Sequence, residues 1–158
     1  MKLAEQVLDA ARAHRWRVAT AESCTGGMVA SALTDIVGSS DVFDRGFVTY
    51  SYESKEDMLG VSRVTLQEHG AVSREVAAEM AKGALRASQT DISIAITGVA
   101  GPGRSENKPE GLVWFSIASS DGVETEEMQF GAIGRQNVRQ ASVEHALRML
   151  LKVLTMPK

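Results

Sequence analysis

Apolar residues along the chain follow two spacings, and each spacing predicts a kind of element. Recurrence every three or four positions predicts helices over residues 2–13, 26–37, 54–59, 61–69, 73–88 and 134–154. Runs of β-branched and aromatic residues predict strands over residues 17–20, 43–51, 91–97, 112–119 and 123–130. Segment 91–97, Asp-Ile-Ser-Ile-Ala-Ile-Thr, is the clearest strand, because isoleucine takes every second position and smaller residues lie between.

Helices alternate with strands early in the chain, and a hairpin around residues 120–122 comes late. This order predicts an α/β fold, a three-layer α/β/α sandwich with a mixed, partly parallel sheet. Three loops follow strand ends, over residues 21–27, 51–55 and 98–111. Ligands on such sheets bind outside the carboxyl ends of the strands, so we expect these loops to meet at one site. The length fits a single domain over residues 1–158.

Composition narrows the function classes. The formal net charge is −3 and the pI is about 5.6. This composition lacks the excess of basic residues that is typical of a nucleic-acid-binding protein. No apolar run approaches the roughly 18–20 residues of a membrane span. A single cysteine forms no internal disulfide, and the N-terminus has no signal-peptide apolar core. We therefore expect a cytoplasmic protein with no nucleic-acid or membrane partner.

The stretch Thr-Ala-Glu-Ser-Cys-Thr-Gly-Gly, over residues 20–27, carries the most informative chemistry. It joins a strand to a helix, so its backbone N–H groups and hydroxyls lie at a helix N-terminus, where negative charge is favoured. Serine and cysteine are candidate nucleophiles, and the glycines let a ligand approach the backbone. The residues concerned are Ser23, Cys24, Thr25, Gly26 and Gly27. Alternatively, the threonine is an ordinary N-cap, the glycines only make a turn, and the cysteine is a small buried hydrophobe.

A serine nucleophile needs a base, and the best-placed candidate is Lys55. It lies in a strand-end loop that can face Ser23, and Ser–Lys pairs work when burial or nearby charge lowers the pKa of the lysine. The alternative is a solvated helix lysine among acidic neighbours. Tyr50 ends the preceding strand and can orient a substrate or donate to an oxyanion. The histidines are expected to be surface or packing residues: His14, His69 and His145.

The loop from Thr97 to Gly111 is rich in glycine and carries Arg104 and Lys108. Exposed amides beside basic side chains suit a phosphate group. The loop does not match a Walker motif, and no Gly-x-Gly-x-x-Gly follows the first strand. No cluster of cysteine, histidine and carboxylate residues has metal-ligand spacing, so we expect neither a metal nor a cofactor.

Together these stretches resemble the CinA C-terminal domain family. The resemblance spans nearly the whole chain and rests on Thr-Ala-Glu-Ser-Cys-Thr-Gly-Gly, Phe-Asp-Arg-Gly-Phe-Val-Thr-Tyr-Ser, Lys55, His-Gly-Ala-Val-Ser, Thr-Gly-Val-Ala-Gly-Pro-Gly and Lys-Pro-Glu-Gly-Leu-Val-Trp. Members are nicotinamide-nucleotide amidases, which convert nicotinamide mononucleotide to nicotinate mononucleotide and ammonia in pyridine nucleotide recycling. Longer members add a molybdopterin-binding-like domain, so we expect the stand-alone deamidase form.

The resemblance implies roles for individual residues. Ser23 would attack the amide with Lys55 as base and Tyr50 in the catalytic set. Substrate-binding positions would be Cys24, Thr25, Gly26, Gly27, Thr97, Gly98, Gly101, Pro102, Gly103 and Arg104. Backbone N–H groups from 24 to 27 would stabilise the oxyanion, and the 98–103 loop would hold ribose or phosphate. We expect a small-molecule nucleotide substrate and a homo-oligomer.

Two alternatives stay open. One is a non-catalytic nucleotide-binding accessory protein of the competence/damage-inducible type. The other is a hydrolase that uses Cys24 as its nucleophile. The loop also departs from the common family pattern: Arg104 and Ser105 follow Gly103 where many members have a glycine pair, and the loop is one residue shorter. This departure concerns the phosphate contacts rather than the reaction.

Overall fold

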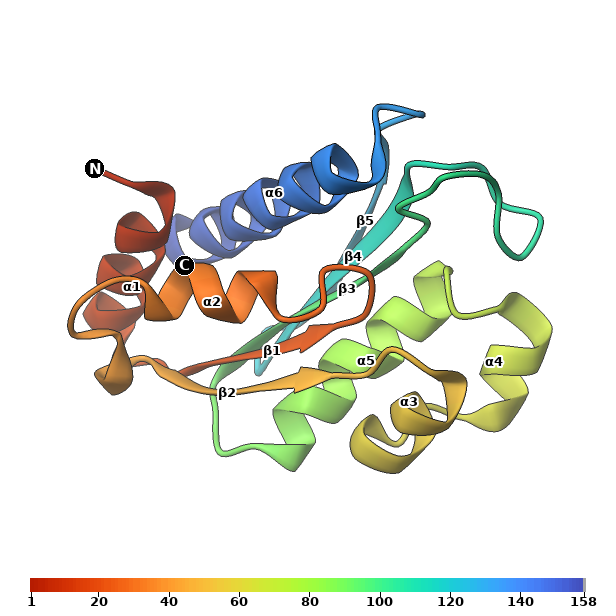
Figure 1. Ribbon diagram of the computed structural model, residues 1–158. Helices are drawn as coiled ribbons and strands as arrows, with labels where there is room; N and C mark the ends of the chain where they lie inside the picture. Colours follow the sequence, from red (N-terminus) through yellow and green to blue (C-terminus); the bar gives the residue numbers. More distant parts are fainter. Residues whose placement is uncertain (158) are drawn as a thin grey trace.

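The computed structural model describes residues 1–157 and is built around a five-stranded sheet with strand order β2-β1-β3-β4-β5 (Figure 1). Strand β1 pairs in parallel with β2 and β3, whereas β4 pairs antiparallel with β3 and β5. The strands are β1 (Val18–Glu22), β2 (Phe43–Val48), β3 (Ile92–Gly98), β4 (Leu112–Ser119) and β5 (Gly122–Gln129). The mixed, partly parallel sheet expected from the sequence is therefore confirmed.

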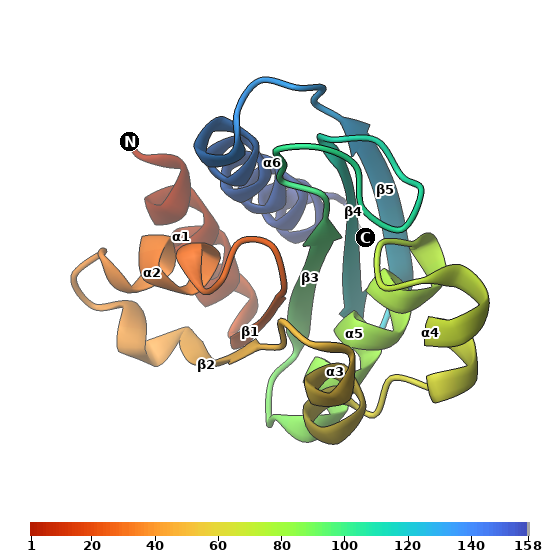
Figure 2. The same ribbon diagram turned by 45° about the vertical axis from the view of Figure 1, so that its right-hand side comes forward.

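Helices cover both faces of this sheet (Figures 1 and 2). One face packs against α1 (Leu3–His14), α2 (Met28–Thr34) and α6 (Arg135–Thr155). The other packs against α3 (Tyr52–Leu59), α4 (Arg63–His69) and α5 (Arg74–Ala87), and a short 3-10 turn, η1 (Ser39–Asp41), precedes β2. These three layers confirm the predicted α/β/α sandwich. Among the described helices, none has both the length and the hydropathy required to cross a bilayer.

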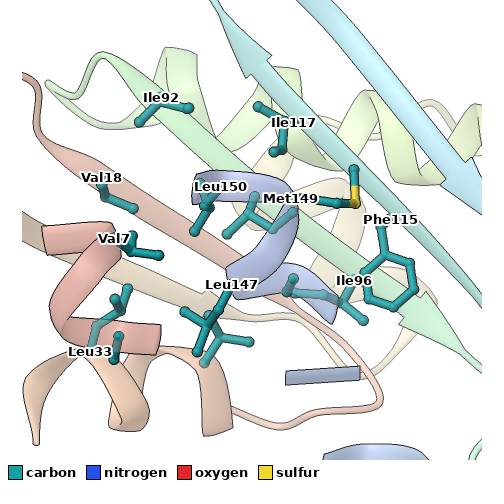
Figure 3. Close-up of a cluster of buried hydrophobic side chains, with 14 of the residues drawn as sticks. Val7, Val18, Leu33, Ile92, Ile96, Phe115, Ile117, Leu147, Met149 and Leu150 are labelled. Carbon is teal, nitrogen blue, oxygen red and sulfur yellow. The ribbon is translucent and has the colours of Figure 1, made fainter. Parts of the chain in front are cut away.

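The alternation of β3 sends different side chains to the two faces. Its isoleucines join the core beneath α1, α2 and α6, together with Phe115 from β4 and Leu147 and Leu150 from α6 (Figure 3). On the opposite face Ser93 donates from Oγ to the carbonyl of Ala81 in α5 (2.6 Å). Thus the same strand supports a large aliphatic core on one side and a close helix contact on the other.

Several boundaries differ from the prediction: β2, for example, ends at Val48 and not at 51, and α2 ends at Thr34 and not at 37. Three of the differences have a clear local reason. Strand β1 continues to Glu22 because parallel neighbours pair with it on both sides. Helix α2 begins only at Met28, because Gly26 and Gly27 take positive φ angles of 57° and 104°. Helix α3 begins at Tyr52, because the side chain of Ser51 accepts a hydrogen bond from the amide of Ser54 (3.1 Å) in a capping box.

Candidate active site

The loops after β1, β2 and β3 meet around a cavity of about 290 Å³. Because these three strands run parallel, their carboxyl ends lie at one edge of the sheet. The first loop contributes Ser23 and Cys24, and the segment after β2 contributes Tyr50, Tyr52 and Lys55. The loop after β3 lines the cavity from position 97 through position 106. The expectation that the three loops form one site is confirmed.

Ser23 and Lys55 are in direct contact in this cavity. Lys55 Nζ donates to Ser23 Oγ at 3.0 Å and to the carbonyl of Thr49 at 2.7 Å. A third, longer contact of 3.4 Å reaches the carbonyl of Tyr50. Lys55 is only 1% exposed, so it is not the solvated helix lysine of the alternative interpretation. The pair has the hydrogen-bonded geometry of a nucleophile and its base.

Burial also changes the proton affinity of Lys55. Loss of water around the amine lowers its pKa from 10.5 to about 8, against the opposing negative charge of Glu106. The Lys55 amine is therefore neutral in part of the molecules near neutral pH, and a neutral amine can accept a proton from a hydroxyl.

Cys24 lies beside Ser23 at the edge of the cavity, and its side chain packs into the hydrophobic core. Its side chain is 6% exposed and packs in the core with α1, α2 and α6. Burial raises the pKa of its thiol to about 12, so the thiol stays protonated at neutral pH. A protonated, core-facing thiol is a poor nucleophile, and Cys24 thus fits the description of a small buried hydrophobe.

Glu22 holds the start of α2 from inside the protein. The side chain is fully buried. Its Oε1 accepts from Thr25 Oγ1 (2.7 Å) and the amide of Val29 (2.9 Å), and its Oε2 accepts from the amide of Ala30 (3.0 Å). The carboxylate thereby satisfies free N–H groups of the helix N-terminus and fixes the turn that contains Ser23.

Three residues of the predicted binding set lie outside the cavity lining: Thr25, Gly26 and Gly27. Thr25 is fully buried and donates to Glu22, while Gly27 is the N-cap of α2. The amide of Gly26 donates to the carbonyl of Ser23 (3.1 Å) and is already engaged. Thr25 is not the N-cap of α2, because Gly27 holds that position and the carboxylate of Glu22 accepts hydrogen bonds from the first helical amides.

Helix α6 contributes two arginines to the site. Arg139 donates from Nε to the carbonyl of Cys24 (3.0 Å) and from Nη2 to that of Thr25 (3.5 Å), which orients the peptide groups after Ser23. Arg135 donates from Nη1 to the carbonyl of Gly101 (2.6 Å) and from Nη2 to the hydroxyl of Tyr50 (3.1 Å). Arg135 therefore ties the third loop to the end of β2 across the cavity.

The remaining predicted binding residues line the cavity along the third loop: Thr97, Gly98, Gly101, Pro102, Gly103 and Arg104. Thr97 Oγ1 donates to the carbonyl of Ala71 (2.8 Å), so its hydroxyl is occupied by a contact to the segment before α5. Arg104 is exposed and donates from Nη2 to the carbonyl of Asn107 (3.1 Å). Its guanidinium is therefore positioned at the cavity wall by its own loop.

Among the lining residues with titratable or charged side chains, sequence reasoning missed Tyr52, Glu106 and Arg135. Tyr52 and Glu106 lie within loops that were singled out, whereas Arg135 lies at the start of the last helix, and no local pattern shows that these side chains turn inward. The available signals were the carboxylates within a glycine-rich loop and an arginine at the start of the last helix. Within residues 1–157 no group of three or more histidine, cysteine or acidic side chains is placed to bind a metal ion.

Comparison with known proteins agrees with this architecture. A model of the CinA C-terminal domain family matches residues 1–154. Nicotinamide-nucleotide amidohydrolase PncC of Escherichia coli K12 is 50% identical over 151 residues, which cover 95% of this chain and 92% of that protein. The PncC protein of Enterobacter agglomerans is 49% identical over 157 residues, which cover 96% and 95%.

A solved structure of a relative has the same fold. The crystal structure of competence/damage inducible protein CihA from Agrobacterium tumefaciens matches with a TM-score of 0.93 and 49% sequence identity, over 98% of this chain and 94% of that one. The family match spans nearly the full chain, and sequence and structure agree on it. The chain belongs to the CinA C-terminal domain family.

Proposed function

We propose that this protein is a nicotinamide-nucleotide amidohydrolase that converts nicotinamide mononucleotide to nicotinate mononucleotide and ammonia. The observation that carries the proposal is the contact of 3.0 Å between Lys55 Nζ and Ser23 Oγ inside the cavity. Two relatives with 50% and 49% sequence identity to this chain are named nicotinamide-nucleotide amidohydrolase PncC. The contact supplies a chemical mechanism by which this chain would perform the same reaction.

In the first half-reaction, Ser23 Oγ attacks the carboxamide carbon while neutral Lys55 takes the hydroxyl proton. The resulting ammonium donates a proton to the amide nitrogen, the carbon–nitrogen bond breaks, and ammonia leaves. The nicotinoyl group is then esterified to Ser23. In the second half-reaction Lys55 takes a proton from water, hydroxide attacks the ester, and Ser23 recovers its proton as nicotinate mononucleotide leaves.

The oxyanion of the tetrahedral intermediate would be stabilised by the backbone amide of Cys24. That amide directly follows the nucleophile, and Arg139 orients the same peptide segment through the carbonyl of Cys24. A donor of this kind contributes roughly 3–4 kcal/mol to transition-state stabilisation. The expected donors were the backbone amides of residues 24 to 27. The amide of Gly26 is not available for this role, because it already donates to the carbonyl of Ser23.

The substrate is an anion, and the cavity offers positive charge along one side. Arg104 and Arg135 line it on the third-loop side, next to the backbone of Gly101, Pro102 and Gly103. We assign ribose and phosphate to this side and the nicotinamide ring to the end with Ser23 and Tyr50. The guanidinium groups would bind phosphate oxygens in the paired geometry that arginine favours.

The test is ammonia release from nicotinamide mononucleotide by the wild type and by Ser23→Ala, Lys55→Ala and Cys24→Ala variants. We expect turnover by the wild type, a loss of at least about a thousandfold in the first two variants, and most activity kept in the third. Circular dichroism of each variant establishes that it is folded. If the folded wild type releases no ammonia, the amidase proposal fails and a nucleotide-binding accessory protein becomes the better account.

A further inference from the structure

Glu106 places a carboxylate in the cavity wall, and the proposed mechanism assigns it no role. Among the described residues that line the cavity, the titratable or charged side chains are Cys24, Tyr50, Tyr52, Lys55, Arg104, Glu106 and Arg135. A carboxylate would repel a substrate phosphate, so Glu106 is not a phosphate ligand although it lies on the same loop as Arg104. Its hydrogen bonds indicate a different role.

Glu106 joins three separate segments. Its Oε2 accepts from the amide of Ala71 at 3.0 Å and, through a short hydrogen bond, from the hydroxyl of Tyr52 at the start of α3. Its Oε1 accepts from the amide of Val72 at 3.1 Å and lies 3.4 Å from Lys108 Nζ. A carboxylate with this many donors is stabilised in its ionised form: burial alone would raise the pKa of Glu106, but the bonds from Tyr52, Val72 and Ala71 outweigh it and the pKa is lowered.

The surrounding backbone is shaped to admit this side chain. A Cβ atom on Gly70 would lie 2.6 Å from Glu106 Oε1 and 3.0 Å from Lys108 Nζ, so a side chain at this position would displace both groups. Lys108 adds hydrogen bonds to the carbonyls of His69 (2.6 Å) and Val72, and Thr97 holds the carbonyl of Ala71. The segment before α5 is therefore fixed from several directions, with Glu106 at the centre.

This arrangement reaches Lys55 through α3. Tyr52 and Lys55 are three residues apart in that helix, so their side chains leave the same side. Tyr52 anchors the first turn of α3 to Glu106, and Lys55 extends from the same turn to Ser23. A rotation of this turn would move the amine away from the hydroxyl.

We propose that Glu106 is a positioning residue, whose carboxylate ties the first turn of α3 to the segment before α5 and so holds Lys55 opposite Ser23. This inference rests on the proposed function of Lys55 as the base. The negative charge of Glu106 has a second effect. Burial lowers the pKa of Lys55, and the charge of Glu106 acts in the opposite direction and raises it. Removing the charge would therefore lower the pKa of Lys55 further, which a purely structural contact would not do.

The experiment compares Glu106→Gln with Glu53→Gln as matched control. Glu53 is an exposed carboxylate in the same first turn of α3, so its charge is screened by water. For each protein we would measure ammonia release against pH, thermal unfolding, and the titration of the Lys55 side chain by NMR. We expect kcat to fall about tenfold or more in Glu106→Gln, with the acid limb of the pH profile moved to lower pH, and neither change in the control.

A second variant protects the test against misfolding. Tyr52→Phe removes the hydroxyl that binds Glu106 but leaves the carboxylate charge in place, so we expect kcat to fall while the pKa of Lys55 is not lowered. Unchanged kcat in folded Glu106→Gln, or in Tyr52→Phe where the first variant does not fold, overturns the proposal. The NMR titration needs no turnover, so an inactive wild type would refute the proposed function while the effect of Glu106 on Lys55 is still measured.

Discussion

The two faces of the sheet are both buried but are built from different side chains. Toward α1, α2 and α6 the core contains large residues, among them Leu8, Leu33, Ile94, Phe115 and Leu150. Toward α3, α4 and α5 alanine predominates, with Ala21, Ala71, Ala81, Ala84, Ala95 and Ala118 in one cluster. The first face can bury much apolar area, whereas the second lets backbone approach backbone.

This difference in side-chain size gives the two faces different roles: one mainly stabilises the fold, and the other places the residues of the cavity. On the small-residue face α5 comes close enough for Ser93 Oγ to bind its backbone, and a Cβ atom on Gly83 would lie 1.9 Å from the carbonyl oxygen of Leu59 in α3. This close packing puts α3 beside the end of β1, where Lys55 reaches Ser23. The large-residue face carries most of the core, and the small-residue face sets the geometry of the site.

The largest expected effect comes from truncating the large-residue face. Ile94→Ala removes a fully buried side chain from the central strand, and we expect the free energy of unfolding to fall by about 4 kcal/mol. The activity of the molecules that stay folded should be preserved, because Ile94 points away from the cavity. Urea unfolding and kcat measured below the transition test both parts. Val37→Ala, at a side chain that is 98% exposed, is the control and should change stability by less than about 0.5 kcal/mol. A loss of kcat in folded Ile94→Ala would contradict this difference in roles.

Overpacking the small-residue face should damage both properties. Gly83→Ala introduces a Cβ atom against the backbone of Leu59, and backbone cannot move aside as a flexible side chain can. We expect a loss of about 3 kcal/mol, despite the higher helix propensity of alanine, together with a drop in kcat as α3 is displaced. Lys82→Ala, at the exposed neighbouring position, should leave both values unchanged. Normal kcat in destabilised Gly83→Ala would show that α3 placement does not depend on this contact.

The sequence predicted the elements of both faces, because helical and alternating periodicity reports burial directly. The alternation of isoleucine with smaller residues in β3 even indicated that its faces differ. The site was predictable to the level of loops, since parallel strands bring their carboxyl ends together. Within the loops, Lys55 Nζ lies in hydrogen-bond contact with Ser23 Oγ, and these are the two residues that the resemblance implied would act together.

What the sequence did not reveal is which polar side chains turn inward. Glu22 was taken only as part of a turn, although its carboxylate caps α2 from a fully buried position. Glu106 and Arg135 act on residues far away in the chain, so no local pattern reports their partners. Such contacts depend on the tertiary arrangement of loops, where periodicity carries no information.

Burial of the Lys55 amine on the small-residue face lowers the stability of the folded state. In Lys55→Met the chain keeps a side chain of similar length but no buried amine, and we expect stability at pH 7 to rise by about 1 kcal/mol while activity is lost. The pKa of Lys55 is lowered from 10.5 to about 8, so the unfolded state binds more protons than the folded state between these values. Wild-type stability should therefore rise with pH through this window relative to the variant. Parallel stability–pH curves in urea unfolding would contradict the assignment.

The smallest expected effect lies on the large-residue face, at His145. Its ring packs edge-on against Phe115 with centroids 4.5 Å apart, and its Nε2 is buried with no hydrogen-bond partner among residues 1–157. Burial lowers the pKa of His145 from 6.5, the charge of Glu126 opposes this shift, and Arg148 adds to it. The unfolded state then takes up a proton first, so wild-type stability should fall as pH drops through 6.5.

His145→Gln, which carries no charge at any of these pH values, should reduce that loss. The measurement is the free energy of urea unfolding from pH 8 to pH 5 for the two proteins, and the difference between them isolates His145 from the other histidines. Curves that stay parallel through pH 6.5 would mean that the ring is protonated equally in both states. A difference that opens below pH 6.5 would show that even the face that stabilises the fold carries a small pH-dependent cost.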